Sequence, residues 1–142
     1  MKKKIKTIPE VIPKRTFSIC DPIFQQQIYV LINQDEKSYC KFLTRIGVKK
    51  IEKEHLECSR FQGFSTYVEN EDGVRDYIIF LKEFNWTIKH QGTLIHEITH
   101  TVIKIFEANN IPFNHDTQEF IAHSITGIYE ALCRKLLVIV KP

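Results

Sequence analysis

The sequence has no long apolar run, no paired-cysteine motif and no internal repeat. Its longest apolar run covers only residues 136–140, whereas a membrane-spanning helix needs roughly twenty apolar residues. The four cysteines form no CxxC pair, which is typical of thiols in a reducing compartment. The residues that follow the basic start form no apolar stretch of the kind found in secretion signals. We therefore expect a cytoplasmic protein with no membrane partner.

The length and composition predict one folded domain. A chain of 142 residues with 43% hydrophobic residues can bury a core of its own. The charge is unevenly distributed along the chain, whose net charge is +3. The first fifteen residues carry +5, and the remaining residues carry −2. Residues 1–24 contain Pro9, Pro13 and Pro22 and are interpreted as a basic N-terminal arm. The single domain is then 25–142, and its oligomeric state stays open.

Hydrophobic periodicity, turn residues and caps predict an α+β domain with the element order βαββαα. The expected elements are a strand within 25–33, a helix from Asn33 or Asp35 to Gly47, a hairpin of 64–70 and 74–84 around Asp72-Gly73, a helix from Gly92 or Thr93 to about Asn109, and a helix from an Asp116 N-cap to about Leu137. Residues 48–60 are charged and stay unassigned. The expected sheet is small and mixed, with a packing helix.

The most informative segment is residues 96–100, which read His-Glu-Ile-Thr-His and match the pattern HExxH. On a helix, His96 and His100 project about 40° apart, so both imidazoles can reach one metal ion. Glu97 lies one position round the helix, where a carboxylate can act as general base for a water on that ion without binding the ion. The residue types and their spacing predict a catalytic zinc site.

A catalytic zinc ion takes three protein ligands and keeps a fourth position for water, so the pattern requires one more donor. Glu119 is the leading candidate, because the segment after His100 is long enough for the next helix to fold back. His123 lies on the same helix face as Glu119. The alternative is that the histidine face of the helix is simply exposed to solvent. Ile103 lies near the His96 side, where a fully exposed face would not carry an isoleucine, and this favours the metal site.

These residues resemble a known family. HExxH at 96–100 followed by Glu119-x-x-Ala122 is similar to the gluzincin, or thermolysin-like, class of zinc metallopeptidases. The stretch 92–100, reading GTLIHEITH, also looks like the small metallopeptidase-like proteins of tailed bacteriophages and prophages. The specific resemblance covers residues 92–123, and it implies a minimal zincin-like fold in which an HExxH helix is followed by a glutamate-bearing helix.

The resemblance implies a role for each site residue. His96, His100 and Glu119 would bind zinc, and Glu97 would activate water. Thermolysin-like enzymes commonly carry an aspartate four residues after the ligand glutamate, whereas this chain has His123, which would act on a ligand, the metal or the substrate. His115 is a further candidate for substrate contact. The metzincin extension of HExxH is absent, because Ile103 and Phe106 occupy its glycine and third-histidine positions.

We therefore expect a zinc-dependent metallopeptidase that hydrolyses peptide bonds in a peptide or protein substrate. If residues 77–81 formed the sheet edge beside the HExxH helix, they could pair with an extended substrate, as the resemblance implies for zincins. Two alternatives stay open: a catalytically weak zinc-binding phage or prophage accessory protein, and, less favoured, a nucleic-acid-binding protein that uses the lysine-rich arm.

Overall fold

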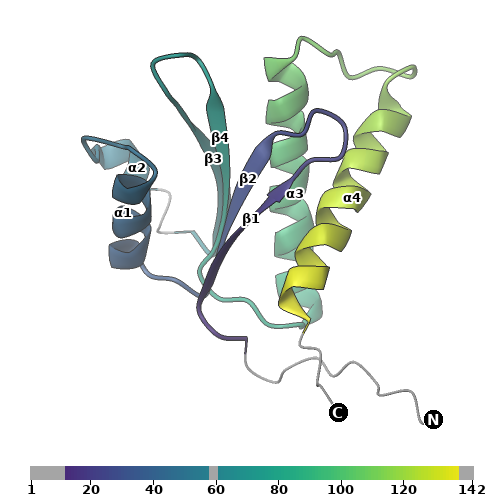
Figure 1. Cartoon of the computed structure of the whole chain (residues 1–142). Coiled ribbons are helices and arrows are strands. Elements are labelled where there is room, and N and C mark those ends of the chain that lie inside the picture. Colours follow the sequence, from purple (N-terminus) through teal and green to yellow (C-terminus); the bar gives the residue numbers. More distant parts are fainter. Residues whose placement is uncertain (1–11, 58–60, 138–142) are drawn as a thin grey trace, which may run out of the picture.

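Four strands form one mixed sheet, which lies between helices on both of its faces (Figure 1). The computed structural model describes residues 12–57 and 61–137. The strands are β1 (Arg15–Cys20), β2 (Gln27–Ile32), β3 (Gly63–Glu69) and β4 (Arg75–Leu81), and the helices are α1 (Glu36–Arg45), α2 (Lys53–Glu57), α3 (Ile88–Ala108) and α4 (Gln118–Leu136). The α+β class and the mixed sheet are thus confirmed.

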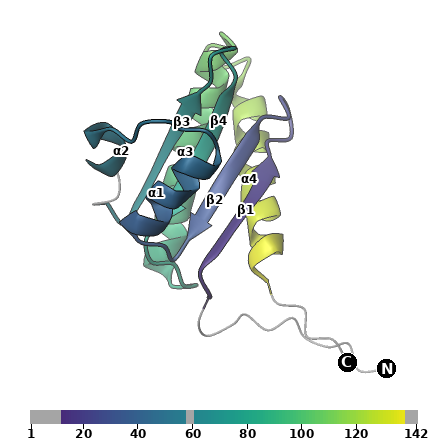
Figure 2. The ribbon, with the colours of Figure 1, turned by 60° about the vertical axis from the view of Figure 1, so that its left-hand side comes forward.

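The strands lie in the order β1-β2-β4-β3. The central pair, β2 and β4, is parallel, and both outer pairs are antiparallel. The helix α1 covers one face of the sheet, and α3 with α4 covers the other (Figure 2). The predicted order βαββαα lacked β1 and the short helix α2. Residues 77–81 were considered as a sheet edge, and this is wrong, because β4 lies between β2 and β3.

Strand β1 comes from the segment interpreted as an arm. Phe17 and Ile19 point to the α4 side and Thr16 and Ser18 to the opposite, exposed side, which is the period of two expected of a strand. Asp21 bends the chain back toward β2, because its carboxylate accepts backbone N–H bonds from the turn at 23–26. Most of the lysine-rich arm, residues 1–11, lies outside the described residues.

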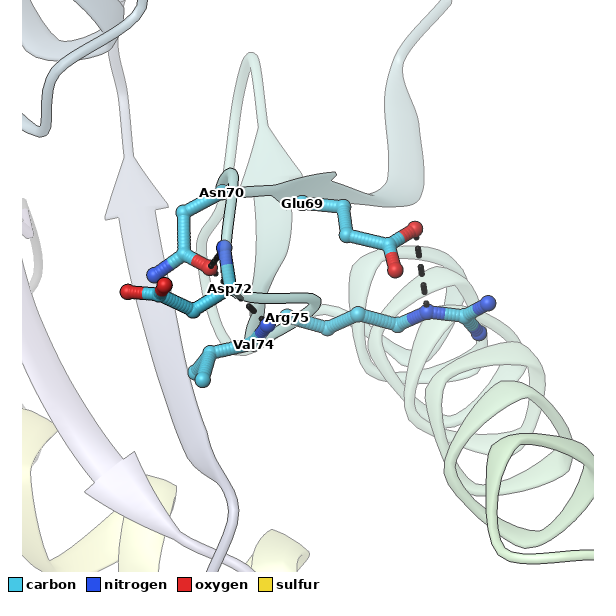
Figure 3. A network of polar contacts seen from close by, with 5 residues as sticks. All are labelled: Glu69, Asn70, Asp72, Val74 and Arg75. Carbon is cyan, nitrogen blue, oxygen red and sulfur yellow. Dashed lines mark hydrogen bonds and ion pairs between the residues drawn. The ribbon is translucent and has the colours of Figure 1, made fainter.

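The predicted helix at 33–47 and the predicted hairpin are both confirmed. Asp35 caps α1 by accepting the Ser38 N–H at 2.8 Å, and Gly47 ends that segment with a φ of 101°. In the hairpin, the Asn70 side chain accepts N–H bonds from Asp72 and Val74 (Figure 3). Beside this turn, Arg75 pairs with Glu69 at 3.7 Å.

Two apolar clusters hold the layers together, one on each face of the sheet. The larger cluster lies under α3 and α4, and its helical part is Leu94, Ile98, Val102, Ile105, Phe106, Ile128, Leu132 and Leu136. The smaller cluster lies under α1 and includes Tyr39, Phe42, Leu43, Phe64 and Phe80. Within the described ranges, no helix is both long and apolar enough to cross a bilayer.

The outer edge of β3 has a defined set of backbone groups that do not pair with β4. The Lys82 N–H donates to the Gln62 carbonyl at 2.8 Å, and the Asn70 N–H donates to the Val74 carbonyl at 2.9 Å. In an antiparallel pair, residues that face the partner strand alternate with residues that face away. Even-numbered residues of β3 therefore face β4, and Gly63, Ser65 and Tyr67 turn their N–H and C=O groups outward.

The same alternation applies at the opposite edge of the sheet. The Asp21 N–H donates to the Gln26 carbonyl at 3.1 Å, so odd-numbered residues of β1 face β2. Thr16, Ser18 and Cys20 consequently turn their backbone groups outward.

Helix α3 packs its Thr93 and Glu97 side chains against the backbone of Gly63, at the start of β3. A Cβ atom built on Gly63 would lie 2.8 Å from Thr93 Cγ2 and 3.1 Å from Leu81 Cδ2, closer than unstrained carbon atoms approach. The Thr93 hydroxyl is held by the Lys89 carbonyl at 3.2 Å, which opposes rotation of its methyl group out of the way. Glycine is therefore required at 63 by the close approach of the helix.

A side chain at position 63 should push helix α3 away from strand β3. We expect Gly63→Ala to lower the free energy of unfolding by about 1–3 kcal/mol through overpacking. Gly92→Ala is the matched control on the same helix, because a Cβ there meets nothing within 4 Å, and it should raise the free energy of unfolding by about 0.5–1 kcal/mol. Urea unfolding of both variants tests this, and a Gly63→Ala protein as stable as the wild type would contradict it.

Candidate metal centre

Helix α3 carries the HExxH residues and begins earlier than predicted. Thr87 is its N-cap and accepts the His90 N–H at 3.3 Å, so the helix starts at Ile88 and not at Gly92 or Thr93. The His90 ring is itself held, because its Nδ1 atom accepts the Asn85 N–H at 2.9 Å. The HExxH residues therefore lie in the middle of a long helix. At this position helical turns before and after them hold the backbone in place.

The two histidines converge on one point. Their Nε2 atoms lie 3.1 Å apart, and the rings meet edge to face at 81° with centroids 4.6 Å apart. Two nitrogens bound at about 2.0–2.1 Å to one tetrahedral zinc ion lie roughly 3.3 Å apart, so the pair matches the spacing of two ligands on one ion. Both side chains are exposed, which leaves their nitrogens accessible from solvent.

Glu97 lies between the histidines and the sheet, where it is only 6% exposed. Its Cγ atom lies 3.4 Å from where a Cβ of Gly63 would stand, so the missing side chain of Gly63 makes room for the glutamate. Burial raises the pKa of the Glu97 carboxyl, and the charges of His96, His100 and Lys104 oppose this rise. A carboxylate with a raised pKa is better matched to proton transfer near neutral pH.

Lys104 is a neighbour of the site that the sequence analysis missed. It lies one turn beyond His100 on α3, and its Nζ atom donates to the Ser65 carbonyl and, at 2.9 Å, to the Ser65 Oγ atom of β3. The spacing of four residues after His100 was the available signal, because such residues share a helix face. Its ammonium brings positive charge to the side of the site that borders the sheet edge.

Glu119, the predicted third ligand, lies in the first turn of α4 with an exposed side chain. The helices α3 and α4 run in opposite directions (Figure 1). The position of His100, eight residues before the end of α3, lies about 12 Å along the axis from that end. The structure thus brings His96, Glu97 and His100 together and leaves Glu119 near the far end of the pair. Among residues 12–57 and 61–137, no group of three His, Cys, Asp or Glu side chains is arranged to hold a metal ion.

The remaining candidates are exposed. His123 follows Glu119 by one turn on α4, and the Nδ1 atom of His115 lies 3.2 Å from Gln118 Nε2. The predicted N-cap at Asp116 is wrong, because the cap position is Thr117 and it makes no side-chain capping bond. The Thr117 hydroxyl donates instead to the Pro112 carbonyl within the preceding loop. Helix α4 therefore starts one residue later than the predicted N-cap indicated.

Comparisons of the chain with models of protein families, with curated proteins and with solved structures find no match.

Burial of the Glu97 carboxylate has a measurable consequence for stability. Because burial raises its pKa, the charged form destabilises the metal-free fold, and Glu97→Gln should raise the melting temperature by a few degrees at neutral pH. The gain should shrink as the pH falls through the raised pKa, where the wild-type carboxyl takes up a proton. Glu71→Gln, an exposed change in the turn between β3 and β4, should leave the melting temperature unchanged. A lower melting temperature for Glu97→Gln at neutral pH would contradict this account.

Proposed function

We propose that the protein is a zinc-dependent metallopeptidase of the gluzincin type. The observation that carries the proposal is the pair of Nε2 atoms 3.1 Å apart beside a buried glutamate on the same helix. His96 and His100 would hold the ion, with Glu119 as the third ligand. When bound, zinc supplies a Lewis acid that polarises a carbonyl group and makes water acidic enough to attack it.

Glu97 would move the proton. It accepts a proton from the attacking water and delivers it to the nitrogen of the leaving amine, so its charge is restored at the end of the reaction. Its burial supports this role, because a raised pKa brings the carboxyl closer to the operating pH. The same burial holds the side chain in one place, between the histidine pair and Gly63.

The outer edge of β3 would hold the substrate. It lies beside α3, because Lys104 of that helix donates hydrogen bonds to Ser65. The backbone groups that Gly63, Ser65 and Tyr67 turn outward can pair with an extended peptide. This assigns to β3 the role that the sequence analysis considered for residues 77–81. Peptide bonds in such a chain would lie along the histidine face of the helix.

The third ligand is the part of the proposal that requires movement. Because Glu119 and the histidine pair are not gathered in a group that could hold an ion, a zinc site with all three ligands would require that they approach each other. A site with only His96 and His100 would bind zinc weakly and would favour the alternative of a catalytically weak zinc-binding protein, of the kind expected in a phage or prophage.

We place the protein in the cytoplasm, where Cys20, Cys40 and Cys133 would stay free thiols, as they are in the structure. Cys58 lies outside the described residues.

Metal content and hydrolysis, measured on the same samples, test this proposal. The wild type should bind one zinc ion and hydrolyse an unstructured protein such as casein. Glu97→Gln should keep the zinc and lose about 10²–10⁴ of the rate, because it retains the ligands and removes the base. His96→Ala should lose both the zinc and the hydrolysis.

A fourth variant, Glu119→Gln, separates the two alternatives. If Glu119 is a ligand, this variant should bind zinc more weakly than the wild type and be nearly inactive, while Glu130→Gln, an exposed change further along α4, should resemble the wild type. Zinc binding without hydrolysis in the wild type would support the accessory protein. A wild type that takes up no zinc from a replete buffer would refute both.

A further inference from the structure

The outer edge of β3 is not free along its whole length. Ser65 lies in the middle of the strand, and its C=O group faces away from β4. The Lys104 ammonium reaches this carbonyl from α3 and also bonds the Ser65 hydroxyl at 2.9 Å. A charged donor from the helix therefore occupies the carbonyl to which an added strand would donate an N–H.

This contact is held by the packing of α3 and not by a flexible surface chain alone. Lys104 is half-buried, and its neighbours in the helix are the partly buried Ile103 and the buried Ile105. Its ammonium is bonded to the sheet edge at Ser65, and its charge also acts on the Glu97 carboxyl. A peptide that pairs with β3 must therefore pass directly by this ammonium.

We propose that Lys104 makes the edge of β3 selective for acidic peptide segments. The inference rests on the proposed docking of peptides at this edge. An added strand places its own N–H on the Ser65 carbonyl, so Lys104 must share or give up that bond. A neutral peptide offers the ammonium no charged acceptor in place of the Ser65 carbonyl. A Glu or Asp side chain next to Ser65 on the added strand offers a charge-assisted bond in its place.

The same contact protects the free edge in the absence of a peptide. Exposed strand edges pair readily with other chains, and lysine on an edge is a common way to prevent this. Lys104 acts from the neighbouring helix, so it blocks the edge without disturbing the β3–β4 pairing. Selection for an acidic segment and exclusion of other strands follow from one set of hydrogen bonds.

Peptide binding to the full chain in EDTA tests the inference without hydrolysis. The probes are two fluorescein-labelled octapeptides, one alternating threonine with glutamate and one alternating threonine with glutamine, and the readout is fluorescence anisotropy. The wild type should bind the glutamate peptide about tenfold more tightly than the glutamine peptide. Lys104→Met should bind both equally, because the methionine keeps the unbranched apolar part of the side chain and removes the ammonium. Lys89→Glu, at an exposed site in the first turn of α3, should keep the preference.

Two proline variants locate the bound peptide. Ser65→Pro removes an outward N–H from β3 and should weaken binding of both peptides, while the matched change Ser18→Pro removes an outward N–H from β1 and should not. Equal affinities in the wild type, a preference retained in Lys104→Met, or loss of binding only in Ser18→Pro would each overturn the inference. Because neither zinc nor turnover enters the assay, a failed peptidase proposal and a failed docking proposal give different results.

Discussion

The contact between α3 and the edge strand β3 is the constraint on which the candidate site depends. At Gly63 the strand has no side chain of its own, and the Thr93 and Glu97 side chains of α3 pack against its backbone. This proximity buries the glutamate and raises its pKa, and it lets Lys104 reach the strand two residues further on. A bulkier residue at 63 would move the helix and alter all of these features together.

The helix α3 combines a packing role and a chemical role by using different faces. Its buried face, with Leu94, Ile98 and Val102, is fixed against the sheet and is part of the main core. That fixed face determines where the opposite face points, and there the exposed His96 and His100 rings contact each other through their Nε2 atoms. In the proposed site the helix spacing would supply two ligands, whereas a third ligand would depend on how α4 returns along α3.

Local sequence signals predicted the local structure well. The Asp35 cap of α1 and the convergence of His96 with His100 both follow from spacings of four residues or fewer, and the structure has both. Strand β1 was missed because six residues near several prolines give a weak signal. The position of β4 inside the sheet was missed because its parallel pairing with β2 joins segments far apart in sequence. The separation of Glu119 from the histidines depends on the course of the 109–117 loop, about which helix periodicity carries no information.

X-ray absorption at the zinc edge of the zinc-loaded protein tests the central claim most directly, because it counts and identifies the atoms around the ion. The account predicts two imidazole nitrogens and additional oxygen atoms, all at about 2.0–2.1 Å, with no sulfur. In His100→Ala the signal of one imidazole should disappear. A spectrum with sulfur at about 2.3 Å, or an imidazole signal unchanged in His100→Ala, would contradict the assignment of the site to α3.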